Sequence, residues 1–440
     1  MVTHEGRYSG SIGVINGKIA CITDPNVKIN AEDIIDVRGK YIIPGAIDAH
    51  AHFQDPGITQ REDFEHGTAA CAVGGITTVI SQPVNNPPVF DTQTYLETIK
   101  HYEGRGLVDY GLHGGGSSAN LDKVEDLWVQ TGSPAIKIMM CYSPKEYGMV
   151  DDAQFYQILE KLSPHNGLAY VHAENQALVQ MWEDRYRAEG RIDPMAYNAS
   201  RPAYVEIEAV HRALVLAEQT GCRVIFAHIS TAESLKIIAK ARRRGLNVYA
   251  ESCPHFFTFT SEDMNTHGPY LKFSPVMRDK QNLRKMWELL EKGYVHTLAT
   301  DHCPYEPHEK EVGLNDVWKA PNGVPGLEIM LPVFLNGVRK GMVSLEQVVR
   351  ATSYNPARIY GLYPRKGVLR PGSDADLAVI DFELEKVFSK KDLKSKCPYS
   401  PYIGLTFKGW PVMTLVRGEV VAKNGEICIK PGFGRYFPRY

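Results

Sequence analysis

The sequence has no excess of positive charge. Its 49 lysines and arginines are balanced by 51 aspartates and glutamates, which leaves a formal net charge of −2. Proteins that hold nucleic acid or an anionic membrane surface neutralise phosphate groups with clustered basic side chains. We therefore expect neither nucleic acid nor a membrane among the partners of this chain.

Paired cysteines and long apolar runs are also missing. The eight cysteines are scattered singly, without a CxxC pair, and a chain of 440 residues can build a large core without disulfides. The N-terminal residues lack the apolar run of a signal peptide, and no uninterrupted apolar stretch approaches the ~18 residues of a membrane helix. We expect a soluble, cytoplasmic protein with reduced thiols.

Short apolar runs of β-strand character alternate along the chain with longer segments of helical periodicity, such as residues 151–162. Strands that are apolar throughout are typical of a parallel sheet covered by helices on both faces. Such units closing on themselves form a (β/α)8 barrel, while an open doubly wound sheet remains the competing architecture. The predicted strands are 41–50, 75–82, 107–112, 135–141, 168–172, 223–228, 246–251 and 295–300.

Both ends of the chain have a different pattern. Residues 1–40 and 368–440 contain short strand-like pieces separated by turn signals such as Asn16-Gly17 and Asn424-Gly425. We expect the two ends to meet in one small β-sandwich beside the barrel. The predicted division is 1–43 for the first part of the sandwich, 44–367 for the barrel, and 368–440 for the rest of the sandwich with a C-terminal arm.

Polar side chains interrupt the apolar strands near their C-terminal ends, where barrel enzymes place their sites. His50 and His52 share one strand face, because alternate residues point the same way, and can hold one metal ion together. Each such residue also has a structural explanation, such as a hydrogen-bonded core histidine or a helix cap. Their combination at successive strands favours a binuclear metal site. The remaining candidates are Lys137, His172, His228 and Asp301.

Several motifs extend this pattern over almost the whole chain. They are HAHFQDPGITQREDF at 50–64, GGITTVISQPVNNPP at 74–88, VHAEN at 171–175, AHIS at 227–230 and TDHCP at 300–304. Together they resemble the cyclic amidohydrolases: dihydropyrimidinases, hydantoinases, allantoinases and dihydroorotases. The resemblance implies two divalent metal ions, Zn²⁺ in that family, bridged by Lys137 carboxylated on its side-chain nitrogen. It assigns His50, His52 and Asp301 to one ion, and His172 and His228 to the other.

The expected reaction is the hydrolytic opening of a cyclic amide or ureide ring by a metal-bridging hydroxide. Asp301 would accept the proton of the water and return it to the leaving nitrogen. The ion held by His172 and His228 would polarise the scissile carbonyl. Tyr142 would donate a hydrogen bond to the developing oxyanion.

The substrate class follows from fewer residues. Dihydroorotases carry an arginine that grips the substrate carboxylate where this chain has Gln54. Tyr142 and Ser274 resemble the hydantoinase and dihydropyrimidinase arrangement, in which the serine backbone binds the ring amide. Pro325 stands where dihydropyrimidinases have asparagine, and its carbonyl can still accept a hydrogen bond. We expect a hydantoin or dihydropyrimidine substrate; the allantoinase-like segment ESCPH at 251–255 keeps allantoin as an alternative.

Two other classes compete with a ring-opening enzyme. Some relatives serve as structural or assembly proteins, but those lack several of the metal ligands, whereas this chain has all six. An amidohydrolase for an acyclic amide is the third alternative. The resemblance also implies a homo-oligomer, either a tetramer or a dimer, that acts on a small molecule.

Overall fold

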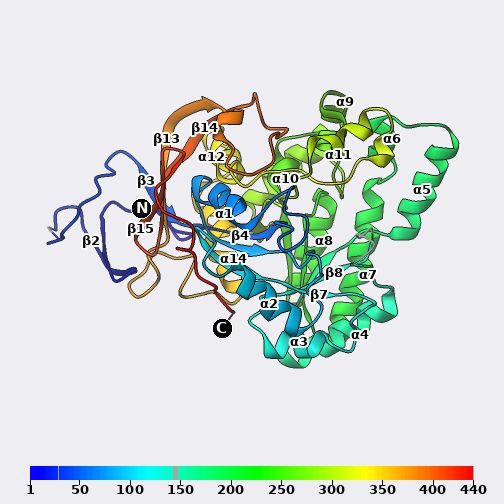
Figure 1. Ribbon diagram of the computed structural model, residues 1–440, viewed down its shortest axis with the longest axis horizontal. Coiled ribbons are helices and arrows are strands. Elements are labelled where there is room, and N and C mark those ends of the chain that lie inside the picture. The colour runs from blue at the N-terminus through cyan, green and yellow to red at the C-terminus, as the bar shows by residue number, and fades with distance from the viewer. Residues whose placement is uncertain (28, 142–146, 440) are drawn as a thin grey trace.

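The centre of the molecule is a closed ring of parallel strands (Figure 1). The structure is a computed structural model that describes residues 1–27, 29–141 and 147–439. β4 to β6 pair in chain order, and β7 to β12 form a second parallel row. β7 follows β6 after the single residue His113, and Ala51 in β4 forms a parallel bridge with His302 beyond β12, so the two rows close into one barrel. The strands are β4 (Ala46–Ala51), β5 (Ile76–Ser81), β6 (Asp109–Leu112), β7 (Gly114–Gly116), β8 (Ile136–Met139), β9 (Leu168–His172), β10 (Arg223–Phe226), β11 (Val248–Ser252) and β12 (Thr297–Leu298).

This closure decides between the two architectures that the sequence left open. An open sheet would have two free edges. Here β4 contacts the segment after β12, so the strands close into a barrel. Each of the eight predicted runs overlaps one of these strands, and β7 continues β6 beyond His113 without a helix between them, so the nine labelled strands make eight units. The expected (β/α)8 barrel is therefore the observed fold.

The first predicted strand, 41–50, is wrong as one element. It divides at Gly45 into β3 (Tyr41–Pro44), which pairs with β13 in another sheet, and β4 of the barrel. A Cβ at Gly45 would lie 2.1 Å from Thr77 Oγ1, so only glycine fits the point at which the chain changes sheets. An apolar run in the sequence does not reveal where the chain passes from one sheet to another.

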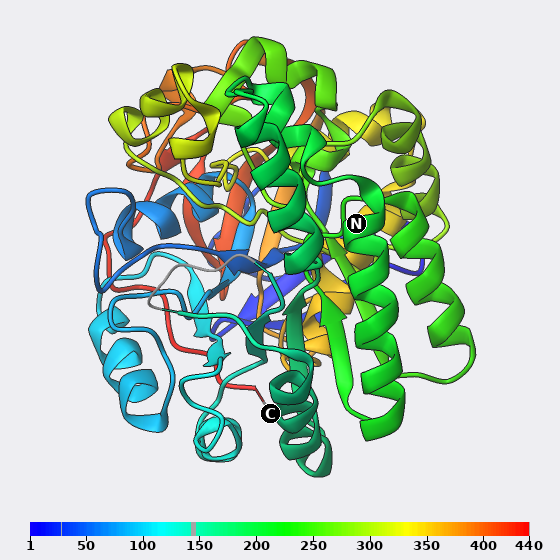
Figure 2. The same cartoon turned by 90° about the vertical axis from the view of Figure 1, so that its right-hand side faces the viewer.

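Helices surround the strands in the view of Figure 2. Their ends follow local rules: the side chain of Thr231 caps α8 by accepting from Ser234 N–H, and Lys240, Arg242 and Arg243 lie in its last turn. The helices are α1 (Phe64–Val73), α2 (Thr92–Tyr102), α3 (Val124–Gln130), α4 (Asp152–Leu162), α5 (Gln176–Ala188), α6 (Pro194–Ala199), α7 (Ala203–Thr220), α8 (Ala232–Arg243), α9 (Met264–His267), α10 (Lys280–Glu291), α11 (Pro307–Glu311), α12 (Met330–Arg339), α13 (Leu345–Val349) and α14 (Asn355–Ile359), with a π-helical turn at Arg350–Tyr354.

The two ends of the chain meet in antiparallel sheets at one side of the barrel (Figure 1). β1 and β2 form a hairpin whose turn residues Asn16 and Gly17 both have positive φ, as a tight two-residue turn requires. The hairpin is tied to the C-terminal part by the bond from Ala375 N–H to the carbonyl of Gly17. The strands are β1 (Ser11–Ile15), β2 (Lys18–Thr23), β3, β13 (Leu377–Val387), β14 (Thr406–Val416), β15 (Glu419–Lys423) and β16 (Glu426–Ile427). The boundaries at 43/44 and 367/368 stay predictions.

The last residues run along the barrel itself. Phe437 N–H donates to the carbonyl of Tyr110 at 2.7 Å, and Arg439 N–H donates to that of Gly132. The C-terminal arm therefore packs against β6 and against the segment before β8 of its own chain. Among the residues that the structure describes, no helix combines the length and apolar character needed to cross a membrane.

Candidate metal centre

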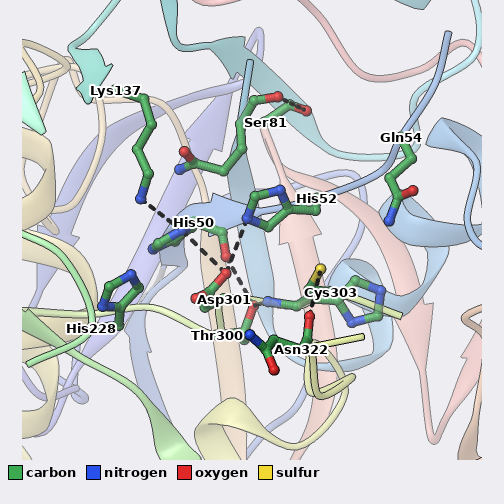
Figure 3. Close-up of polar contacts among 12 residues, drawn as sticks. His50, His52, Gln54, Ser81, Lys137, His228, Thr300, Asp301, Cys303 and Asn322 are labelled. Carbon is green, nitrogen blue, oxygen red and sulfur yellow. Dashed lines mark hydrogen bonds and ion pairs between the residues drawn. The ribbon is translucent and has the colours of Figure 1, made fainter. Parts of the chain in front are cut away.

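Residues from five barrel strands or the turns that follow them converge at the C-terminal end of the ring; Figure 3 shows them apart from His172. His50 lies in β4 and His52 just after it, Lys137 lies in β8, and Asp301 follows β12. Asp301 Oδ1 is 3.2 Å from His50 Nε2 and 3.1 Å from His52 Nε2, while Lys137 Nζ is 3.3 Å from His50 Nε2. These four side chains can share one cation.

The other two histidines lie beside this group. His172 ends β9 and His228 follows β10, and their ring centroids are 4.6 Å apart. The His228 ring is also stacked against that of His50, with centroids 5.5 Å apart. The structure thus brings all six predicted ligands to one place.

The backbone is strained at two of these positions. His228 has φ 36° and Asp301 has φ 45°, a left-handed conformation that costs free energy in residues with a side chain. Such strain persists only where the surroundings hold it, and it is concentrated at functional sites. Here it turns each side chain at the end of its strand.

Burial sets the charge state of the donor atoms. It lowers the pKa of His50 and His228 well below the ordinary value, so both rings are neutral and keep a lone pair for a cation. Burial also lowers the pKa of Lys137, against the opposing effect of Asp301. For Asp301 burial acts to raise the pKa, but His50, His52 and Lys137 outweigh it and the pKa is lowered. The centre therefore offers neutral nitrogens, an ionised carboxylate and an easily deprotonated amine.

Two carboxylates lie behind the histidines. Glu251 Oε1 is 2.8 Å from His50 Nδ1, which Tyr170 OH also approaches at 2.6 Å. Glu174 Oε2 is 2.8 Å from Nε2 of His172. A carboxylate on one ring nitrogen fixes the orientation of the ring and leaves the other nitrogen for a metal.

The sequence argument gave these supporting residues no role. The available signal was an acidic residue ending an otherwise apolar strand, as Glu251 does in β11, or following a candidate ligand by two positions, as Glu174 does. Which histidine each carboxylate supports depends on the packing of distant segments, since Glu251 is 201 positions from His50.

Among the six predicted ligands, one buried side-chain atom has no hydrogen-bond partner within the described part of the chain. It is Nδ1 of His228, a residue that is 2% exposed. Buried polar atoms are nearly always paired, so an unpaired imidazole nitrogen beside other donors fits a metal ligand. The nitrogen and oxygen donor set suits a divalent transition metal.

The predicted substrate residues have different surroundings. Ser274 Oγ donates to Glu174 Oε2 at 2.7 Å and accepts from Arg201 Nη1 at 2.9 Å, so its side chain belongs to the support of His172. Pro325 is buried next to Gly326, whose N–H donates to His302 Nδ1. Tyr142 lies outside the described residues.

Comparison with known proteins agrees with this geometry. The model of the amidohydrolase family matches residues 41–421. The chain belongs to the amidohydrolase family. This amidohydrolase is 38% identical to an L-hydantoinase of Paenarthrobacter aurescens over 100% of the chain and 96% of that protein. It is 34% identical to a D-hydantoinase of Geobacillus stearothermophilus (100% and 95% covered) and 33% identical to an allantoinase of Deinococcus radiodurans (98% and 95%).

Solved structures show the same fold. The L-hydantoinase (dihydropyrimidinase) from Arthrobacter aurescens superposes with a TM-score of 0.97 at 37% identity, covering 100% of this chain and 98% of that one. A dihydropyrimidinase from Brevibacillus agri gives a TM-score of 0.93 at 30% identity, covering 100% and 96%. The predicted family and the predicted barrel with a β-sandwich are confirmed. The amidohydrolase is a metal-dependent hydrolase by family, and His50, His52 and Asp301 form a group able to hold a metal ion.

Proposed function

We propose that this amidohydrolase opens the ring of a cyclic amide or ureide of the hydantoin or dihydropyrimidine type by hydrolysis. The observation that carries the proposal is the convergence of four imidazoles, Lys137 and Asp301 at the barrel mouth, in a chain similar over its full length to hydantoinases. A non-catalytic assembly protein has no need to keep this set.

The proposed cofactor is a pair of divalent ions, Zn²⁺ by resemblance. His50, His52 and Asp301 would hold one ion and His172 and His228 the other, with Lys137 bridging as its carbamate. A bridging lysine must first lose its proton to react with CO2, which the lowered pKa of buried Lys137 favours. When bound, such ions lower the pKa of a water and polarise a carbonyl.

The residues of the chain supply the proton transfers and the orientation of the ring. Asp301, ionised because its pKa is lowered, would accept the proton from water at Oδ and deliver it to the leaving ring nitrogen. We assign the main chain at Ser274 and Pro325 to binding of the ring amide. Tyr142 would donate to the developing oxyanion.

Hydrolysis of hydantoin, dihydrouracil, allantoin and dihydroorotate by the purified protein, with metal content measured on the same sample, tests the proposal. We expect ring opening of hydantoin or dihydrouracil with about two metals per chain and loss of activity on chelation. A metal-loaded protein that is inert on all four substrates would contradict the substrate class.

Allantoin is the second candidate. Allantoinases are among the relatives at 33% identity, and residues 251–255 resemble their motif. Dihydroorotate is disfavoured, since Gln54 replaces the arginine clamp and the nearby Arg61, which donates to Gln54, is already paired with Glu309. A kcat/KM for allantoin above that for hydantoin would select the allantoinase branch.

We also propose a homotetramer or homodimer, on the family resemblance, and cytoplasmic action, on the sequence. Light scattering of the purified protein tests the assembly; a strictly monomeric protein would contradict it.

A further inference from the structure

Glu62 lies where three separate segments of the chain meet. It belongs to the loop between β4 and α1 and is fully buried. Its Oε2 accepts a hydrogen bond from His302 Nε2 at 3.0 Å and another from the hydroxyl of Ser395. Its Oε1 accepts from the main-chain N–H of Lys396 at 3.3 Å. Residues 389–397, which we call the strap, lie in the segment that connects β13 to β14, so a segment between sandwich strands reaches the mouth of the barrel.

The ring of His302 has one consistent pattern of protonation. Gly326 N–H donates to Nδ1 at 3.1 Å, so Nδ1 carries no proton. Nε2 therefore holds the ring proton and donates it to Glu62. Both nitrogens are satisfied in a residue that is fully buried. The imidazole thus joins the loop after β4 to the segment that contains Pro325.

The backbone of His302 ties the same region together. Its carbonyl accepts from His52 N–H at 2.7 Å, and the residue forms a parallel bridge with Val324. The preceding residue is Asp301, whose left-handed φ of 45° must be held by its surroundings. The contacts of His302 hold Asp301 from one side, and the hydrogen bonds of Thr300 to Asp48 hold it from the other.

We infer that Glu62 and His302 are positioning residues that hold Asp301 and the segment around Pro325 in register, and that the strap locks this pair through Ser395. The inference rests on the proposed function, because Asp301 and Pro325 take their roles from it. Neither Glu62 nor His302 needs to touch the substrate. Part of the active-site geometry is thereby specified from the sandwich side of the molecule.

The test is Glu62→Gln. A glutamine must turn its amide NH2 either toward the donors His302 and Ser395 or toward the main-chain N–H of Lys396, so at least one contact becomes donor against donor. We expect kcat to fall roughly 10–100-fold, as for other residues that hold a metal ligand in place, and KM to rise because the segment at Pro325 shifts. Deuterium exchange should accelerate in residues 299–304 and 322–327 and stay unchanged in β9 and β10.

Glu328→Gln is the matched control. Glu328 is also buried and accepts from the main-chain N–H groups of Lys394 and Ser395 in the strap, both at 2.9 Å through Oε1. An amide oxygen can still accept both bonds, so kinetics and exchange should stay near those of the wild type. Ser395→Ala removes the lock, together with the acceptor of Cys397 N–H within the strap, and should give a smaller increase in exchange at the same two segments. The Ser395→Ala variant serves as the test if Glu62→Gln is insoluble.

Wild-type kinetics and exchange in Glu62→Gln would overturn the inference. Faster exchange throughout the barrel would also overturn it, because it would make Glu62 a general stabiliser. If the wild type opens no cyclic amide, the proposed function fails, while the exchange comparison still decides whether the pair holds the loop of Asp301.

Discussion

At the scale of single residues, the candidate site contains polar side chains whose burial is unfavourable without a ligand. Lys137 is a lysine that is 1% exposed beside His50 and Asp301, and His228 has a buried ring nitrogen without a partner among the described residues. Both are costly in a protein without a ligand. Both become favourable when cations occupy the centre and Lys137 carries its proposed carbamate.

Lys137→Ala should therefore lose most of the bound metal and with it the activity, because the bridging oxygens disappear. Metal analysis after purification in excess Zn²⁺ measures the effect. Lys310→Ala is the control, since Lys310 is equally buried but donates to the carbonyl of Pro321 instead. A metal-replete, active Lys137→Ala protein would contradict the proposed bridging role of Lys137.

Glu251→Gln should weaken metal binding by about 10–100-fold, because an amide replaces the carboxyl group that orients the ring of His50. Competition with a chelator gives the dissociation constant directly. Tyr170→Phe should have a smaller effect, since the contact of Glu251 with His50 survives. Equal metal affinities in the wild type and Glu251→Gln would show that the carboxylate plays no such part.

The burial of Lys310 should make the free energy of unfolding depend on pH. Burial lowers its pKa to about 7, whereas an unfolded lysine titrates near 10.4. Between these values the unfolded chain binds more protons, so this group makes the free energy of unfolding rise with pH, by at most about 1.4 kcal/mol per unit. Lys310→Met should remove that rise in urea unfolding at pH 7, 8 and 9. Parallel pH profiles for the two proteins would refute it.

At the scale of elements, the passage from β3 to β4 shows how one residue divides a predicted strand. Gly45 sits where the backbone leaves the five-stranded sheet for the barrel, and its N–H donates to the carbonyl of Asp376. Thr77, which a side chain at this position would meet, is itself buried. The change of sheet therefore requires glycine for steric reasons.

Gly45→Ala should destabilise the protein by about 1–3 kcal/mol, because the new Cβ would overlap Thr77 Oγ1. Urea unfolding measures the loss. Gly6→Ala is the control: no heavy atom lies within 4 Å of a Cβ built there, and its φ is not positive. A Gly45→Ala protein as stable as Gly6→Ala would mean that Thr77 can move aside.

At the scale of the whole molecule, a buried ionic cluster joins the barrel to the sandwich at the end opposite the candidate site. Lys366 Nζ pairs with Asp109 at the start of β6 and with Asp374 and Asp376 before β13. Arg417 pairs with Asp109 and also donates to the carbonyl of Phe433 in the C-terminal arm. A few charged side chains therefore tie together the barrel, the sandwich and the C-terminal arm.

Lys366→Met should cost about 3–5 kcal/mol of unfolding free energy, since it leaves buried Asp376 without its cation. Thermal and urea unfolding measure the cost, and metal content should stay at the wild-type level because the centre lies at the other end of the strands. Full stability would argue that the carboxylates take up protons without penalty.

Periodicity and polar residues at strand ends can be read along the chain, so the alternation of strands and helices and the six candidate ligands were predictable from the residues alone. The closure of the barrel, the division at Gly45, and the partners Glu251, Glu174, Glu62 and His302 emerged only from the folded arrangement. Those depend on which distant segments pack together: Ser395 reaches Glu62 across 333 positions. No local pattern encodes such a contact, since its free energy arises only when burial brings the two groups out of water.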